Sequence, residues 1–142
     1  MNEIFSETVT IHGSVNDVWY YFIHLEENAS KWMKGIPFIE KETKGDIKEG
    51  TKFVFQARGK EHSTILTEYE PMTKATLTSI QGNFQADYTY MFLQENDLTK
   101  ITLVAKCDTK GFSKLLTPVI KWAIKKSDAG QLENLKQAFE NR

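Results

Sequence analysis

The amino-acid sequence predicts an α+β domain in which a curved antiparallel sheet of seven strands wraps around one long C-terminal helix. A first strand runs straight into a short helical pattern, and six strand-like stretches then follow almost without interruption. A single long helical pattern begins near Gly111 and runs to the C-terminus. A sheet that curls around one closing helix tends to leave a hollow, so an internal ligand cavity is the leading functional hypothesis.

The length fits one domain spanning residues 1–142. Lys and Arg number 18 against 19 Asp and Glu, and the net charge of −1 provides no overall basic field for nucleic acid. The lone cysteine excludes an intrachain disulfide and is typical of a reducing compartment. No apolar stretch approaches the ~20 residues of a membrane span, and the N-terminus lacks a signal-peptide pattern. We therefore expect a cytoplasmic protein without integral membrane association.

The N-terminal segment alternates as a β-strand does, with one face formed by Phe5, Glu7, Val9 and Ile11. Gly13 ends this strand. Ser14, with Asp17 three residues later, resembles a capping box at the start of a helix. A second short helical turn is expected over residues 28–32. The apolar face of the first helix follows helical spacing, at Val15, Val18, Trp19, Phe22 and Ile23.

Six further strands are predicted between turn residues. They cover residues 38–43, 51–57, 62–69, 74–80, 84–92 and 99–107. Pro71 ends one of them because proline cannot donate to a ladder. The clearest alternation lies in 84–92, where either Tyr88 and Tyr90 or their polar neighbours face the interior. A slip of one residue reverses the assignment.

Beyond Gly111 the apolar period becomes helical, with a first stripe at Phe112, Leu115, Leu116, Val119, Ile120 and Ala123. A second stripe at Leu132, Leu135 and Phe139 is rotated by roughly a third to a half of a turn. The change falls within residues 127–130. Pro118 removes a hydrogen bond from the first half and predicts a kink there. The first half is expected to face the concave side of the sheet, and the second to seal one end.

A series of landmarks lies along the chain: Ser14-Val-Asn-Asp-Val-Trp19, Trp32, Gly50-Thr-Lys-Phe53, Thr67-Glu-Tyr-Glu-Pro71, Leu98-Thr-Lys-Ile-Thr102 and Leu132-Glu-Asn-Leu-Lys136. Their order and spacing resemble the START-like helix-grip superfamily (SRPBCC), and most closely its polyketide cyclase/dehydratase-like branch. The resemblance implies a seven-stranded sheet gripping the C-terminal helix over an apolar cavity, with two short helices between strands 1 and 2. The superfamily includes lipid and hormone binders, aromatase/cyclases and chaperone activators, so fold does not fix function.

We expect the chain to bind a small hydrophobic or amphipathic ligand, lipid-like or polyketide-like, without catalysis. Aromatic stripes usually fill a core, which is the alternative reading of the same side chains. A buried tyrosine hydroxyl needs a partner, which a ligand oxygen or a water would supply. Trp32 is expected at the cavity mouth, because an indole suits a half-wet edge. The candidate ligand-binding residues are Trp32, Phe53, Phe55, Tyr88, Tyr90, Phe92, Leu103, Leu115, Leu116, Val119 and Ile120.

A cyclase or dehydratase is the main alternative, and it requires titratable groups that converge in the cavity. The candidates all lie on predicted strands: Tyr88, Tyr90, Asp87, Glu68 and His62. The three histidines lack metal-ligand spacing, and no Gly-rich phosphate loop is present. Nothing marks Cys107 as an activated thiol. The sequence therefore predicts no metal site, no cofactor and no dedicated catalytic residue.

A third hypothesis is a regulatory module that binds another protein through a sheet edge or through the last helix. That helix carries Lys114, Lys121 and Lys125 on the face opposite its apolar stripe. Such a face is usually solvated. It also suits contact with acidic lipid headgroups or an acidic protein.

Overall fold

The computed structural model describes residues 2–57, 59–81, 84–108 and 117–142. Seven antiparallel strands form one sheet in the order β1-β7-β6-β5-β4-β3-β2, which confirms the predicted sheet. The strands are β1 (Asn2–His12), β2 (Ile39–Lys41), β3 (Lys52–Ala57), β4 (Lys60–Glu70), β5 (Lys74–Gln81), β6 (Phe84–Glu95) and β7 (Leu98–Asp108).

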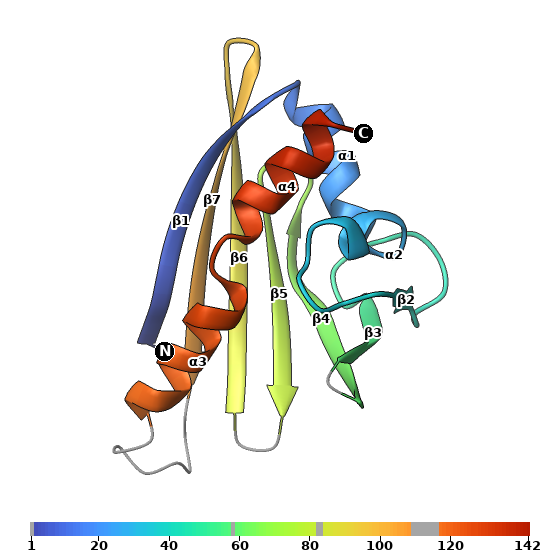
Figure 1. The fold of residues 1–142 in the computed structure, drawn as a ribbon. Coiled ribbons are helices and arrows are strands. Elements are labelled where there is room, and N and C mark those ends of the chain that lie inside the picture. Colours follow the sequence, from blue (N-terminus) through green and yellow to red (C-terminus); the bar gives the residue numbers. More distant parts are fainter. Residues whose placement is uncertain (1, 58, 82–83, 109–116) are drawn as a thin grey trace.

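The helices lie on the concave side of the curved sheet (Figure 1). Between β1 and β2 the chain forms α1 (Val15–Ile23), α2 (Leu25–Asn28) and the 3-10 turn η1 (Ala29–Lys31). After β7 it forms α3 (Thr117–Asp128) and α4 (Gln131–Glu140). In Figure 1, α4 crosses the sheet beside α1, whereas α3 lies at the other end, near the N-terminus of β1.

The start of α1 follows from its capping residue. The backbone N–H of Asp17 donates to Ser14 Oγ at 3.2 Å, which satisfies one of the free donors at a helix N-terminus. The carboxylate of Asp17 also suits the positive end of the helix dipole. One face of α1 is buried against the sheet, as its spacing predicts, at Val18, Trp19, Phe22 and Ile23.

In its described part, the C-terminal helical segment bends at a glycine. Gly130 lies between α3 and α4 with a φ of 93°, a conformation that glycine adopts at little cost. The predicted break within residues 127–130 is therefore confirmed. The expected kink at Pro118 depends on residues 111–116, which lie outside the described part of the structure.

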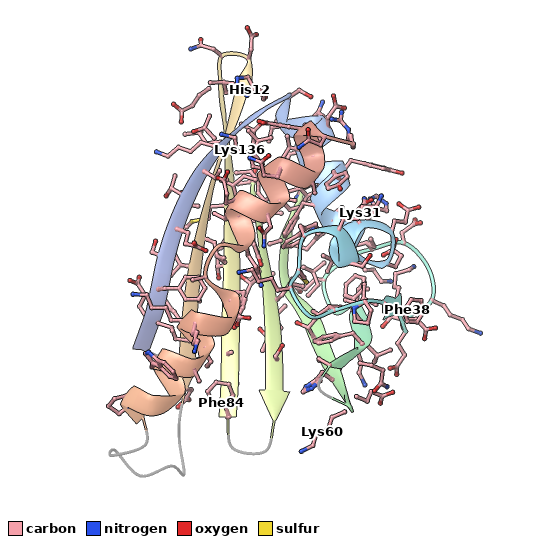
Figure 2. The ribbon with its side chains drawn as sticks, in the orientation of Figure 1. His12, Lys31, Phe38, Lys60, Phe84 and Lys136 are labelled. Carbon is pink, nitrogen blue, oxygen red and sulfur yellow. The ribbon has the colours of Figure 1, made fainter. Side chains whose placement is uncertain are left out.

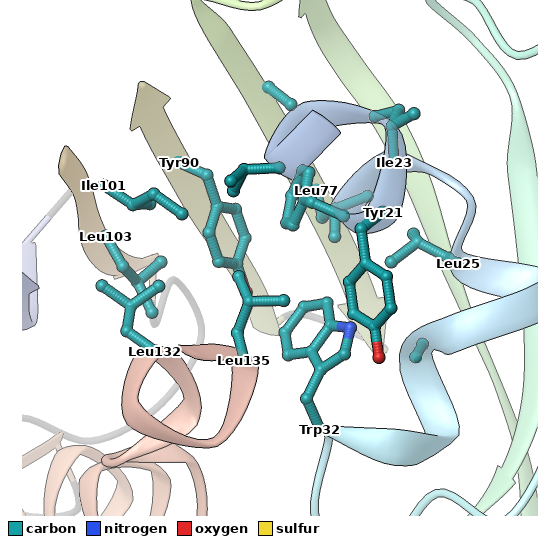
Figure 3. Packing of buried hydrophobic residues seen from close by; sticks show 14 of the residues in the cluster. Tyr21, Ile23, Leu25, Trp32, Leu77, Tyr90, Ile101, Leu103, Leu132 and Leu135 are labelled. Carbon is teal, nitrogen blue, oxygen red and sulfur yellow. The ribbon is translucent and has the colours of Figure 1, made fainter. Parts of the chain in front are cut away.

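Aromatic rings fill the half of the molecule between α1, α4 and the sheet. The Trp19 and Phe92 rings lie 4.9 Å apart, and those of Phe22 and Tyr90 lie 4.6 Å apart. Figure 3 shows Leu135 of α4 next to Tyr90 in this cluster. Figure 2 marks the end of the sheet where β1 meets α4, at His12 and Lys136. The interior between α1, α4 and the sheet is therefore packed with buried side chains.

The turn from β1 into α1 passes close to α4. A Cβ atom added to Gly13 would lie 2.8 Å from Cε1 of Phe139, and the φ of Gly13 is 155°. The carbonyl oxygen of Gly13 also accepts a hydrogen bond from Thr99 Oγ1 at 2.9 Å, which limits how far this turn can shift. Glycine at this position therefore allows α4 to pack over the end of the sheet.

We expect Gly13→Ala to lower the free energy of unfolding by about 1–3 kcal/mol, because the added methyl group overlaps the Phe139 ring. Gly45→Ala is the matched control, since Gly45 also has a positive φ, of 97°, but open space around its Cβ position. Urea denaturation of both variants separates the steric overlap from backbone strain. Equal losses of stability in the two variants would contradict the packing argument.

Candidate functional site

A cavity of about 450 Å³ lies between the sheet, α3 and the segment that leads into β2. Its volume falls within the range of ~300–1,000 Å³ that accommodates small organic ligands. The apolar part of the wall is formed by Met33, Ile36, Ile39, Phe55, Ala57, Leu77, Ala123 and Ile124. The polar part is formed by Lys34, His62, Thr64, Ser79, Tyr88, Tyr90, Asp128 and Gln131.

The inward face of β6 changes from core to cavity along the strand. Phe92 belongs to the aromatic cluster, Tyr90 belongs to both the cluster and the cavity wall, and Tyr88 lines the cavity. The polar neighbours Asp87 and Thr89 contact β5 on the other face, through Thr78 and Thr76. The structure thus places the two tyrosines inward.

The polar end of the cavity lies where the α3–α4 junction meets the sheet. Tyr88 donates its hydroxyl hydrogen to the carboxylate of Asp128 at the end of α3. Tyr90 donates its own to Gln131 Oε1 at 2.6 Å. The tyrosine partners are therefore protein groups rather than a ligand oxygen or a water. The sequence did not identify either partner.

A carboxylate from β1 reaches the same junction. The backbone N–H of Gly130 donates to Glu7 Oε2 at 2.8 Å. Gly130 is the N-cap of α4, so the Glu7 carboxylate pairs with the N–H of the N-cap residue and lies near the positive end of the helix dipole. Hydrogen bonds thereby connect both β1 and the central part of β6 to one helix junction.

Burial keeps both cavity tyrosines protonated. Loss of solvation raises the pKa of Tyr88 far above its usual value of 10, and the adjacent Asp128 carboxylate raises it further. Burial also raises the pKa of Tyr90, with additional repulsion from the carboxylates of Asp128 and Glu7. At neutral pH the two phenols are therefore hydrogen-bond donors to their protein partners, and neither serves as a base.

His62 lies on β4 at the cavity wall, stacked on Phe55 of the neighbouring strand. The two rings are 5.5 Å apart and nearly parallel, with an interplanar angle of 20°. His62 Nε2 lies 3.1 Å from the carbonyl oxygen of Ala57, which only accepts, so this nitrogen carries a hydrogen. The contact holds the ring against the wall rather than directing Nε2 into the cavity.

The predicted ligand-binding residues divide between cavity and core. Phe55, Tyr88 and Tyr90 line the cavity. Three others are buried in the core cluster and are absent from the described wall, namely Phe53, Phe92 and Leu103. Val119 and Ile120 lie on α3, but their side chains, like residues Leu115 and Leu116, lie outside the described part of the structure.

The expected position of Trp32 at the cavity mouth is wrong. Its side chain is only 2% exposed and packs in the core, 5.8 Å from the Phe22 ring and 6.3 Å from the Tyr90 ring. The indole N–H is buried without a hydrogen-bond partner among the described residues. Contact with two aromatic rings offsets that cost. The segment just after it, residues 33–36, supplies the cavity wall instead.

Two of the acid–base candidates lie on the outer face of the sheet. Asp87 accepts a hydrogen bond from Thr78 Oγ1 at 2.8 Å, and Glu68 accepts one from Thr76 and forms an ion pair with Lys74. The pairing of β4 with β5 shifts between Leu66 and Glu68. Such a bulge changes which side of the strand a residue occupies, so Glu68 points away from the cavity that other residues of β4 line.

The residues that sequence reasoning missed are Asp128, Gln131 and the segment 33–36. Asp128 and Gln131 flank the glycine at which the apolar stripe changes face. The sequence signal that could have identified them is a pair of polar residues on either side of the helix break. Among the described residues, no group of three His, Cys, Asp or Glu side chains could hold a metal ion. No helix within the described ranges is long and apolar enough to cross a membrane.

Comparison with known proteins identifies the family. The profile of the family described as "Polyketide cyclase / dehydrase and lipid transport" matches residues 3–140. The chain belongs to this family. The resemblance to the polyketide cyclase-like branch of the helix-grip superfamily is thereby confirmed. A search of curated protein sequences finds no match to the chain.

Solved structures share the fold at low sequence identity. The di-domain ARO/CYC protein BexL from the BE-7585A biosynthetic pathway has a TM-score of 0.79 at 14% identity, over 99% of this chain and 47% of BexL. Ara h 8.0201 has a TM-score of 0.72 at 18% identity, over 97% of both chains. TTHA0849 from Thermus thermophilus has a TM-score of 0.71 at 17% identity, over 96% of both chains. The chain thus spans about half of the BexL di-domain and nearly all of the two other proteins.

The raised pKa of Tyr88 predicts a loss of stability at high pH. Above about pH 10 the unfolded chain releases the phenol proton while the folded chain retains it, so the unfolded state binds fewer protons and stability falls. We expect wild-type stability to fall more steeply than that of Tyr88→Phe, by up to ~1.4 kcal/mol per pH unit between about pH 10 and 11.5.

Urea denaturation across this pH range measures the slopes. Tyr20→Phe is the control, because it removes the same hydroxyl group from a side chain that is 60% exposed. A Tyr88→Phe slope equal to that of the wild type would show that Tyr88 ionises as readily in the folded protein as in the unfolded chain.

Proposed function

We propose that the protein binds a small, predominantly apolar ligand in the cavity between the sheet and α3. The observation that carries the proposal is the cavity itself, about 450 Å³, whose wall combines apolar side chains with a hydrogen-bonded polar cluster at the α3–α4 junction. Apolar surface that leaves water contributes roughly 2.5 kcal/mol per 100 Å² before the costs of association. The family description, which names lipid transport, supports such a role.

The polar end of the cavity favours a ligand that carries a hydroxyl group. Tyr88 and Tyr90 use their only hydrogens on Asp128 and Gln131, so their oxygens present acceptor lone pairs. A ligand hydroxyl that donates to these oxygens would be held at this end of the cavity. The apolar part of the ligand would then pack against apolar wall residues such as Leu77.

Obstruction of the cavity should abolish binding. Ser79 lines the cavity, whereas the next residue along β5, Ile80, is 57% exposed on the other face. We expect Ser79→Phe to eliminate binding of the fluorescent probe anilinonaphthalene sulfonate and of lipids or polyketide-like aromatics found by thermal-shift screening. In the wild type, a ligand at a hundred times its Kd should raise Tm by about 5–10 °C.

Ile80→Phe adds the same side chain one position away and should bind as the wild type does. Native mass spectrometry of the purified protein provides an independent measurement through any ligand that co-purifies. Equal binding by the two phenylalanine variants, or no ligand in either assay, would contradict the proposal.

A second candidate function is a cyclase or dehydratase acting on a polyketide-like substrate. The specific observation that favours it is the contact between Tyr88 and Asp128, two titratable groups that converge at the cavity wall. A carboxylate can accept a proton from a carbon next to a carbonyl, and the Tyr88 phenol would donate to the oxygen that gains charge only after its hydrogen leaves Asp128. The di-domain ARO/CYC proteins that share the fold make this substrate class the first to test.

Substitution of Asp128 separates the two functions. If the protein is an enzyme, Asp128→Asn should lower turnover of an aromatic poly-ketone substrate by about 100- to 10,000-fold, with probe binding retained. Asp87→Asn is the control, because it makes the same change on the outer face of β6. Absence of turnover in the wild type, with binding intact, would exclude this activity for the substrates tested.

A further inference from the structure

The most exposed large apolar side chain among the described residues is Trp122, which lies on α3 and is 62% exposed. The other two tryptophans are buried, at 5% for Trp19 and 2% for Trp32. Isolated apolar residues on a protein surface are common. Trp122 differs from them in its neighbours, because Lys126 Nζ lies 5.0 Å from the centre of its ring, over the indole.

Helix α3 has two distinct sides. At 100° per residue, Pro118, Lys125 and Lys126 fall within about 60° of Trp122 around the helix axis, and all are exposed. Ile124 lies on roughly the opposite side and lines the cavity. The outward side, which we call the Trp122 face, consists of Pro118, Trp122, Lys125 and Lys126.

The charges of α3 are separated in the same way. Its sequence holds three lysines and one aspartate. The aspartate, Asp128, accepts the hydrogen bond from Tyr88 and lines the cavity, so its charge is directed inward. Lys125 and Lys126 therefore flank Trp122 without an acidic side chain of the same helix on the outward side. The Trp122 face is locally basic in a protein whose net charge is −1.

We propose that the Trp122 face adsorbs to an anionic lipid surface. An exposed tryptophan between lysines is complementary to such a surface, since indole rings partition into the headgroup region and each lysine near anionic lipid contributes several-fold in affinity. The charge pattern favours an anionic lipid surface as the binding partner, because the Trp122 face presents cations and an amphipathic ring. The opposite side of the same helix forms part of the cavity wall, so adsorption brings the cavity to the membrane interface.

Tryptophan fluorescence measures this adsorption directly. Because Trp19 and Trp32 are already buried, a blue shift on adding vesicles reports on Trp122. We expect the shift with mixed phosphatidylcholine–phosphatidylglycerol vesicles and not with phosphatidylcholine alone. Brominated lipid should quench the shifted emission, and added NaCl should weaken binding because salt screens exposed charges.

Charge reversal tests the lysines. Lys125→Glu combined with Lys126→Glu should weaken co-sedimentation with the anionic vesicles by roughly 25-fold or more. The control combines Lys44→Glu with Lys48→Glu, which changes the net charge equally at positions before β3 and should bind within about twofold of the wild type. Trp122→Ala should weaken sedimentation while leaving thermal stability unchanged, since the ring is exposed.

The proposal is overturned if the wild type does not bind anionic vesicles, or if the two charge-reversal pairs weaken binding equally. The first result would leave the Trp122 face as a contact for an acidic protein. Adsorption does not depend on an occupied cavity, so Ser79→Phe should bind vesicles as the wild type does. Loss of ligand binding and loss of adsorption are thereby measured separately.

Discussion

The contact between the α3–α4 junction and the sheet is the constraint on which the rest of the structure depends. Glu7 accepts from the N–H of Gly130, and Tyr88 and Tyr90 donate to Asp128 and Gln131. A buried polar group left without its partner costs about 1–3 kcal/mol, so these three hydrogen bonds hold the junction in place. The position of the α3–α4 junction determines which part of the sheet is covered by α4 and which part is covered by α3.

Because α4 and α3 cover different lengths of the sheet, the cavity occupies only part of the space between the helices and the sheet. Around α1 and α4 the interior is filled by closely packed rings, including Trp19, Phe22 and Phe92. Towards α3 the wall includes small side chains, such as Ala57 and Ser79, among larger ones such as Phe55, and the volume between them is unfilled. Packing in the first half stabilises the fold, so the second half can remain hollow without loss of the architecture.

Period-two and helical patterns sufficed to predict the order of elements, the seven strands and the helix break, because those patterns are local. The residues of the cavity wall were harder to predict from the sequence. Either face of β6 was consistent with its alternation, and the bulge beside Glu68 changes the side that a strand residue occupies without leaving a mark in the sequence. By residue type Trp32 suits the edge of a cavity, yet it is buried against Phe22 of α1 and Tyr90 of β6. Asp128 and Gln131 point inward only because the chain bends between them.

The polar end of the cavity also limits which ligands suit it. When a ligand fills the space it removes water from the wall, and polar groups that lose water must regain hydrogen bonds elsewhere. Tyr88 and Tyr90 donate their hydrogens to protein acceptors, so a ligand hydroxyl can donate to a lone pair of either phenol oxygen, whereas a pure hydrocarbon cannot. The net gain from one added hydrogen bond is about 0.5–1.5 kcal/mol, comparable to the burial of one or two methylene groups. A hydroxylated ligand should therefore bind more tightly than a hydrocarbon of equal apolar area.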